Sequence, residues 1–172
     1  MLTMRKILVA LGMGLVVMCG TLSAREVRLP AKEPYVSLNL PWTWKVTRTE
    51  NGVKVRSSDK HVNLSIEALD MATTDVQARM AKQVEQLVAT GIVLDGDSMK
   101  QEKAMLPGGE MVEVSWDATL RDLGPMKVSV SILHLPSNKA LCFLYWATAA
   151  GEQRNKATLA NMLMSIKVIP TK

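Results

Sequence analysis

Cysteine and histidine are scarce in this sequence of 172 residues, which contains two of each. One cysteine, Cys19, lies in an N-terminal segment that we expect to be removed, so the remaining domain keeps only Cys142. A single thiol cannot form an internal disulfide, and the hydrophobic core must therefore provide the stability of the fold. Two histidines also make a poor set of metal ligands. We expect neither a disulfide framework nor a metal or other cofactor.

A strong charge of either sign is also missing. The formal net charge is +5, and loss of the two basic residues in the N-terminal segment leaves 19 basic and 16 acidic residues, a net charge of +3. Domains that bind nucleic acid are usually more basic, so we expect no nucleic-acid partner. The contents of hydrophobic residues (48%) and charged residues (22%) are ordinary and indicate one globular domain with a sizeable core.

Residues 1–24 have the pattern of a secretory signal peptide, in which two basic residues precede an apolar run over 7–18. This run is too short to cross a bilayer comfortably. We expect cleavage after Ala24, a periplasmic location and no transmembrane helix in the mature chain. The alternative is a membrane-anchored lipoprotein with a lipid on Cys19, although Met18 is not the small residue that normally precedes a lipidated cysteine.

The strongest strand pattern covers residues 126–148. Two runs rich in β-branched and aromatic residues flank Pro136-Ser137-Asn138-Lys139, which is typical of an antiparallel hairpin with a tight turn. The second run, 141–147, has almost no polar alternation. A strand that is apolar on both faces must be covered on both, so we expect it in the middle of a sheet with helices packed against it.

The order of the other elements indicates an α+β fold. Residues 25–34 mix charges with two prolines and predict an extended, poorly ordered lead-in to a single domain over 35–170. Two strand meanders are each followed by a helical pattern, one after a capping box at residues 74–77 and one over 151–166. We therefore expect an antiparallel sheet of two meanders, covered by two main helices.

A basic surface is predicted on the first hairpin. Asn51-Gly52 between alternating runs favours a two-residue turn, which places Lys45, Lys54 and Arg56 on one face. Trp42, on the loop beside this hairpin, is a possible anchor for a partner. We expect these four residues to bind an envelope protein or an anionic membrane surface. A merely solvated sheet face and a chaperone-like groove on the sheet's apolar face are the alternatives.

No group of residues indicates catalysis. A thiol enzyme or envelope hydrolase could use Cys142 and His134, but a turn at residues 137 and 138 places the two side chains on opposite faces, and no third orienting group is evident. His61, Glu67 and Asp70 could ligate a metal from one strand, although polar residues on a solvated strand explain them more simply. We therefore expect a protein that is not an enzyme.

Residues 35–41 (YVSLNLP), followed by Trp44-Lys45-Val46 and an Asn-Gly hairpin, resemble the opening of the Mog1/PsbP-like fold. The order of strands and helices up to Ser165-Ile166-Lys167-Val168 extends this resemblance over nearly all of the mature chain. Within the fold, the sequence is most similar to DcrB-type bacterial envelope proteins. The resemblance implies an α/β/α sandwich and a non-enzymatic accessory, assembly or chaperone-like binding role in the cell envelope.

Overall fold

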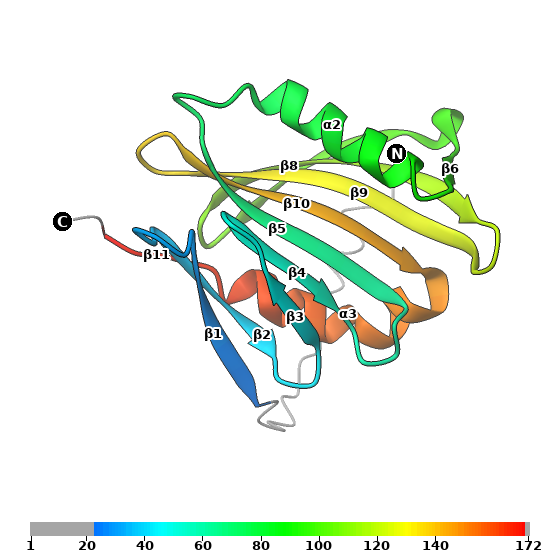
Figure 1. Cartoon of the computed structure of the whole chain (residues 1–172), viewed down its shortest axis with the longest axis horizontal. Coiled ribbons are helices and arrows are strands. Elements are labelled where there is room, and N and C mark those ends of the chain that lie inside the picture. Colours follow the sequence, from blue (N-terminus) through cyan, green and yellow to red (C-terminus); the bar gives the residue numbers. More distant parts are fainter. Residues whose placement is uncertain (1–22, 171–172) are drawn as a thin grey trace.

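Strand β10 (Lys139–Thr148) lies in the middle of an eight-stranded antiparallel sheet, as its apolar sequence predicts (Figure 1). The computed structural model describes residues 23–170. In the large sheet the strand order is β3 (Lys45–Arg48), β4 (Gly52–Arg56), β5 (Val62–Asp70), β10, β9 (Gly124–Leu135), β8 (Gly109–Leu120) and β6 (Ile92–Leu94), and β7 (Lys100–Leu106) also pairs with β8. A second sheet contains β1 (Ala24–Leu29), β2 (Val36–Pro41) and β11 (Lys167–Val168).

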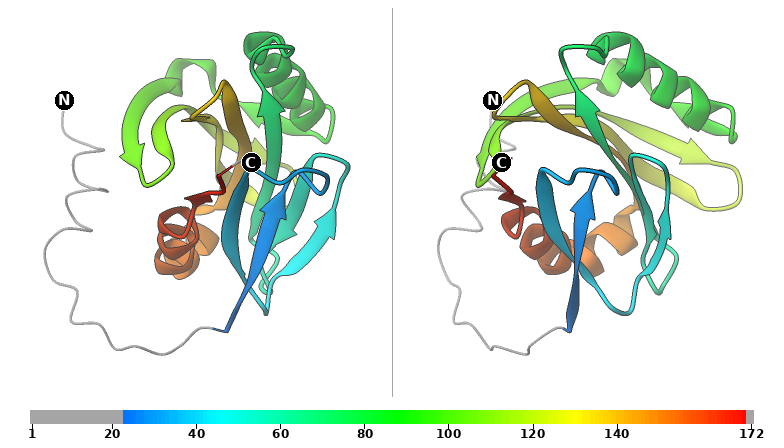
Figure 2. Two further views of the ribbon diagram at one scale, coloured as in Figure 1. Left: turned by 90° about the vertical axis from the view of Figure 1, so that its left-hand side faces the viewer. Right: turned by 60° about the vertical axis from the view of Figure 1, so that its left-hand side comes forward.

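A helix packs on each face of the large sheet. Helix α2 (Val76–Val88) packs on one face, which we call the α2 side, and helix α3 (Ala149–Met164) packs with the small sheet on the other, the α3 side. Figure 2 shows the large sheet curving over α3 and the small sheet. Phe143 points to the α3 side and Cys142 to the α2 side, and both are buried. The expected α+β sandwich with two main helices is confirmed.

The segment expected as a poorly ordered lead-in belongs to the folded domain. Residues 25–29 are extended as predicted, whereas residues 30–33 form bends, with a positive φ at Glu33. Strand β1 pairs with β2 along its whole length, and Val27 and Leu29 are buried in the core. The physical reason is alternation along the strand: Val27 and Leu29 face the core, whereas the charged residues Glu26 and Arg28 point outward. The fold therefore starts before Tyr35.

The helices begin at their own hydrogen-bonding caps. The side chain of Asp75 accepts a hydrogen bond from the amide of Ala78 at 3.0 Å, so the cap of α2 lies one residue after the Thr74 of the expected capping box. Thr148 ends β10 and caps α3 by accepting from the amide of Gly151 at 3.1 Å. Met162 and, just beyond the helix, Ile166 are buried against the sheet, as the apolar spacing predicts.

The turn of the first hairpin differs from the prediction, although the faces of its strands do not. Lys45 pairs with Arg56, and the tight turn is centred on Glu50 and Asn51. The register differs by two residues from the expected one, so every side chain keeps its face. Gly52 instead lies in β4, where a Cβ atom would come within 2.0 Å of the carbonyl oxygen of Ile66. Its role is close contact with β5, not turn formation.

The β9–β10 turn has the expected residues at its tip but a different register. Ser137 and Asn138 both have positive φ, and the amide of Lys139 donates to the carbonyl of Pro136 at 3.3 Å. The ladder nevertheless pairs Leu135 with Lys139, which leaves Pro136 as an extra residue without a pairing partner. Proline has no amide to donate to the ladder. This one-residue difference shifts every later pair of the hairpin by one position. Residues of β9 and β10 that were expected on opposite faces of the sheet therefore share a face.

Candidate functional site

Lys45, Lys54 and Arg56, which we call the basic face, are exposed and share the α2 side of the large sheet. Lys45 and Arg56 lie directly opposite each other on β3 and β4, and Lys54 lies opposite Thr47. The apolar side chains of this hairpin, Val46, Val53 and Val55, pack in the core on the α3 side. Alternation along two short strands thus separates three cations from the apolar residues.

Positive charge on this hairpin is not balanced locally. Residues 45–56 contain four basic residues and one acidic residue, Glu50. Within residues 23–170, none of the three cations of the basic face takes part in an ion pair. The direct opposition of Lys45 and Arg56 is unfavourable for the sheet, because like charges on paired residues repel. Folding alone does not require this arrangement.

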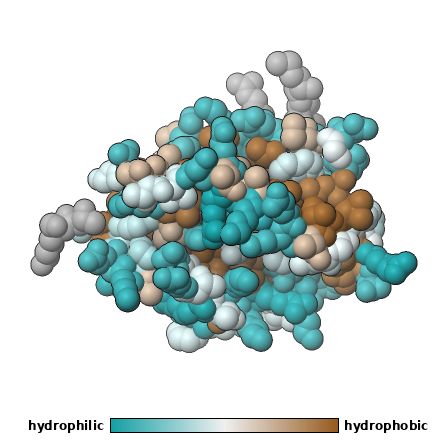
Figure 3. Space-filling model, turned by 45° about the horizontal axis from the view of Figure 1, so that its top comes forward, coloured by the Kyte–Doolittle hydropathy of each residue, from teal (hydrophilic) through white to brown (hydrophobic). Residues whose placement is uncertain are grey.

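The basic face continues across the sheet into polar and aromatic side chains. Arg56 pairs with Asn63, which pairs with Trp146, and the half-buried Trp146 packs against the apolar cluster beneath α2. In Figure 3, where the α2 side comes forward, hydrophilic side chains cover the middle of the surface and an apolar patch lies to the right. This surface therefore combines cations, amide groups and an indole ring.

Trp42 lies in the turn between β2 and β3, shortly before Lys45, the first residue of β3. Of its surface, 56% is exposed. Its cationic neighbour is a residue that the sequence did not indicate. The guanidinium carbon of Arg25 lies 5.6 Å from the centre of the Trp42 ring, and Arg25 also donates to the carbonyl of Trp44 at 2.6 Å. Arg25 falls in the predicted lead-in, and its contacts with Trp42 and Trp44 join positions that are distant in sequence.

A second group of charges on the α2 side is paired and covered. Glu67 on β5 accepts hydrogen bonds from Arg79 at 2.9 Å and from Gln83 at 3.3 Å, and both donors come from α2. The sequence predicts Glu67 on an outward, solvated face, but its side chain is only 17% exposed because α2 packs over it. The same Gln83 accepts a hydrogen bond from the Cys142 thiol, with 3.1 Å between sulfur and oxygen.

Cys142 has the chemistry of an inert thiol. Its side chain has no exposed surface, and burial together with the nearby charge of Glu67 raises its pKa to about 12. The structure corrects the expected geometry: His134 pairs with Ala140 and Cys142 pairs with Ile132, so both side chains are on the α2 side. The cause is the extra Pro136 in the turn. Even so, the thiol donates its hydrogen bond to Gln83 and stays protonated at neutral pH.

The three residues considered as metal ligands have separate partners. His61 Nδ1 lies 3.1 Å from Thr148 Oγ1, Glu67 pairs with Arg79, and Asp70 pairs with Lys139 at 2.7 Å. In the part of the chain that the structure describes, no three acidic, histidine or cysteine side chains converge. The proposed lipidation site, Cys19, lies outside the described residues.

The alternative groove on the sheet's apolar face finds no support in the part of the chain that the structure covers. The apolar residues of β10 are buried by α2 on one side and by α3 with the small sheet on the other. Between residues 23 and 170, no helix is long and apolar enough to span a membrane.

Comparison with known proteins identifies the fold through structure and not through sequence. No family model matches the chain, and no curated protein matches it. Among solved structures, cyanobacterial PsbP from Synechocystis is similar over 92% of this chain and 99% of its own, with a TM-score of 0.58 and 16% identity. The chain has the Mog1/PsbP-like fold.

Two other solved structures share this Mog1/PsbP-like fold. The Ran-binding protein Mog1p of Saccharomyces cerevisiae matches over 86% of this chain and 96% of its own, with a TM-score of 0.51 and 11% identity. LpqN of Mycobacterium tuberculosis, which is involved in cell envelope biogenesis, matches over 86% and 92% of the two chains, with a TM-score of 0.52 and 13% identity. At such identities the likeness establishes the fold alone.

Proposed function

We propose that this protein is a non-enzymatic accessory protein of the bacterial cell envelope, of the DcrB type, and that it is exported to the periplasm. Its basic face and Trp42 bind an acidic partner, which is an envelope protein or an anionic membrane surface. The observation that carries the proposal is the positive charge of Lys45, Lys54 and Arg56, which are exposed and form no ion pair with any residue from 23 to 170. Such a surface attracts anionic partners, whereas the covered faces of the sheet are needed for the core.

Two further observations support a binding role. Trp42 is the exposed aromatic side chain nearest in sequence to the basic face, and exposed tryptophan is a frequent anchor of binding surfaces. The buried Cys142, with its raised pKa, supports the absence of thiol catalysis. Two of the structural neighbours are a Ran-binding protein and a protein of envelope biogenesis, which agrees with a binding protein of the envelope.

The test is association of the purified protein with anionic and neutral lipid vesicles, and with proteins captured from envelope extract. Replacement of the three cations, in K45S/K54S/R56S, should weaken association at low salt, and the wild-type interaction should itself weaken with salt. The matched control is K82S/K100S/K156S, which removes the same charge from exposed positions elsewhere. If both triple variants bind as the wild type does, the basic face is not the binding surface.

Sedimentation with anionic vesicles identifies a membrane partner, whereas capture of an acidic protein without sedimentation identifies a protein partner. Mass spectrometry of the mature N-terminus tests export separately. A chain that begins at Arg25 supports the periplasmic form, a lipid on Cys19 supports the anchored form, and a retained Met1 contradicts both.

A further inference from the structure

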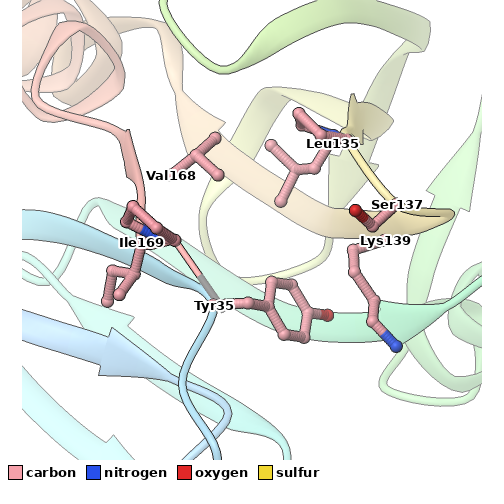
Figure 4. Close-up of a pocket in the computed structure, with 8 residues that line it drawn as sticks. Tyr35, Leu135, Ser137, Lys139, Val168 and Ile169 are labelled. Atoms are coloured by element: carbon pink, nitrogen blue, oxygen red, sulfur yellow. The ribbon is translucent and has the colours of Figure 1, made fainter. Parts of the chain in front are cut away.

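A small cavity lies at the end of β2 that is far from Trp42. Its volume is about 250 Å³, and it lies between the C-terminal segment and the β9–β10 turn, as Figure 4 shows. Most of its lining is apolar, and the residues that form it are Tyr35, Leu135, Pro136, Ser137, Lys139, Val168, Ile169 and Pro170. We call this cavity the C-terminal pocket.

Among the described residues that line the pocket, only Lys139 is charged. The ammonium group of Lys139 is held by Asp70 at 2.7 Å and lies 5.7 Å from the centre of the Tyr35 ring. Asp70 is not part of the lining, and an ammonium group has three donors, so further hydrogen bonds remain possible. Tyr35 is neutral and fixed, because its hydroxyl donates to the carbonyl of Leu69 at 2.9 Å. The pocket thus joins an apolar floor to a positioned cation.

One side of the pocket is an open strand edge. Among residues 23–170, strand β11 pairs only with β2, at the end of the small sheet. The amide of Ile169 donates to the carbonyl of Tyr35 at 2.9 Å, and antiparallel pairs alternate, so the backbone N–H and C=O of Val168 point away from β2. The side chain of Val168 is 41% exposed. These groups are placed to pair with an added strand.

We propose that the C-terminal pocket binds the C-terminus of an extended peptide that ends in an apolar residue. The peptide pairs with the backbone of Val168, its last side chain fills the space beside Leu135 and Ile169, and its terminal carboxylate accepts a hydrogen bond from Lys139. This site lies beyond the basic face, and neither site requires the other.

The test uses ¹⁵N-labelled protein and the peptide acetyl-Ser-Thr-Ser-Thr-Leu with a free carboxylate. Titration followed by NMR should give saturable shifts at the amides of residues 135–139 and 167–169. The same peptide with a C-terminal amide should bind about tenfold more weakly, because it lacks the charge that Lys139 recognises. N-acetylleucine should also bind more weakly, because it cannot pair along the strand.

Two variants have matched controls. Lys139→Met should weaken binding of the carboxylate peptide about tenfold and leave the amide peptide unaffected, whereas Lys127→Met, which breaks another Lys–Asp pair of 2.7 Å, should change neither. Val168→Trp should fill the pocket and abolish binding, whereas Val93→Trp, at an exposed position on the edge strand β6, should not. Thermal unfolding shows whether each variant is folded.

The comparison of carboxylate with amide peptide uses wild-type protein, so it decides the role of charge even if Lys139→Met unfolds. Absence of saturable shifts in the pocket, equal affinity for both peptides, equal affinity for N-acetylleucine and the peptide, or unchanged binding by Val168→Trp would each overturn the proposal. Any of these results leaves the vesicle and envelope tests of the basic face untouched.

Discussion

Charged side chains on the α2 side occur in two neighbouring regions. In one they are covered by α2 and hydrogen-bonded, and in the other they face solvent. Under α2, the carboxylate of Glu67 is paired with Arg79 and bonded to Gln83. On β3 and β4, beyond the helix, Lys45 and Arg56 lie opposite each other with no acidic partner among the described residues. A charge that a helix covers requires a partner, because its loss of hydration is otherwise uncompensated. A charge that remains in water can be left unpaired and available.

The largest effect should come from removing the covered carboxylate. Glu67→Ala leaves Arg79 and Gln83 without their acceptor, and we expect the free energy of unfolding to fall by about 2 to 3 kcal/mol. Urea unfolding measures this loss. The matched control is Glu110→Ala, which breaks the exposed pair with Lys103 and should cost less than about 0.5 kcal/mol. Equal losses in the two variants would contradict the distinction between covered and open charge.

A half-buried carboxylate with two other carboxylates near it should make the stability of the fold depend on pH. On the α3 side, burial raises the pKa of Glu113, and the negative charges of Glu102 and Glu152 raise it further. The folded protein therefore retains this proton at pH values where the unfolded chain has lost it. This group should lower the free energy of unfolding as pH rises from the ordinary glutamate pKa through the raised one, without recovery at higher pH.

Glu113→Gln removes this titration. We expect a flatter dependence of stability on pH and a variant at least as stable as the wild type at pH 7, measured by urea unfolding between pH 4 and pH 8. Glu85→Gln, at an exposed position on α2, is the control and should leave the pH dependence unchanged. A variant that is less stable than the wild type at pH 7, with the same pH slope, would show that ionised Glu113 is compensated.

The smallest effect should come from the open charges. Lys45→Thr relieves the repulsion with Arg56 and should raise the free energy of unfolding by about 0.3 kcal/mol at low salt. Lys54→Thr is the matched control, because Lys54 lies opposite an uncharged threonine. The difference between the two variants should disappear at high salt. A clear loss of stability on replacing Lys45 would mean that the basic face contributes to folding.

Local patterns predicted the elements well and the pairing less well. The alternation of β5 and the apolar run of β10 depend on residues close in sequence, and both strands lie where expected. The pairing of β1 with β2 could not be predicted in this way, because prolines and charges between residues 25 and 34 conceal its inward valine and leucine. The fold class and the two main helices therefore followed from sequence, whereas the true start of the domain did not.

The candidate sites show the same limit. The basic face was predicted because strand parity survives a two-residue register shift. The relation of Cys142 to His134 was predicted wrongly, because one extra residue in the turn, Pro136, places the two side chains on the same face of the sheet. Arg25 and the C-terminal pocket gave no signal, since their contacts join residues more than 15 positions apart. Such contacts depend on how the two sheets pack together.

The arginines between β1 and β3 have a consequence for self-association. Arg25 donates to the carbonyl of Trp44, and Arg48 donates to the carbonyl of Arg28 at 3.1 Å, so the backbones of the two edge strands are joined through side chains. A free strand edge is a template on which other molecules can add in register, which leads to aggregation. Guanidinium groups occupy part of the carbonyl row that such growth would use. Loss of β1 would thus leave the edge of β3 free to pair with strands of other molecules, and would also expose part of the core.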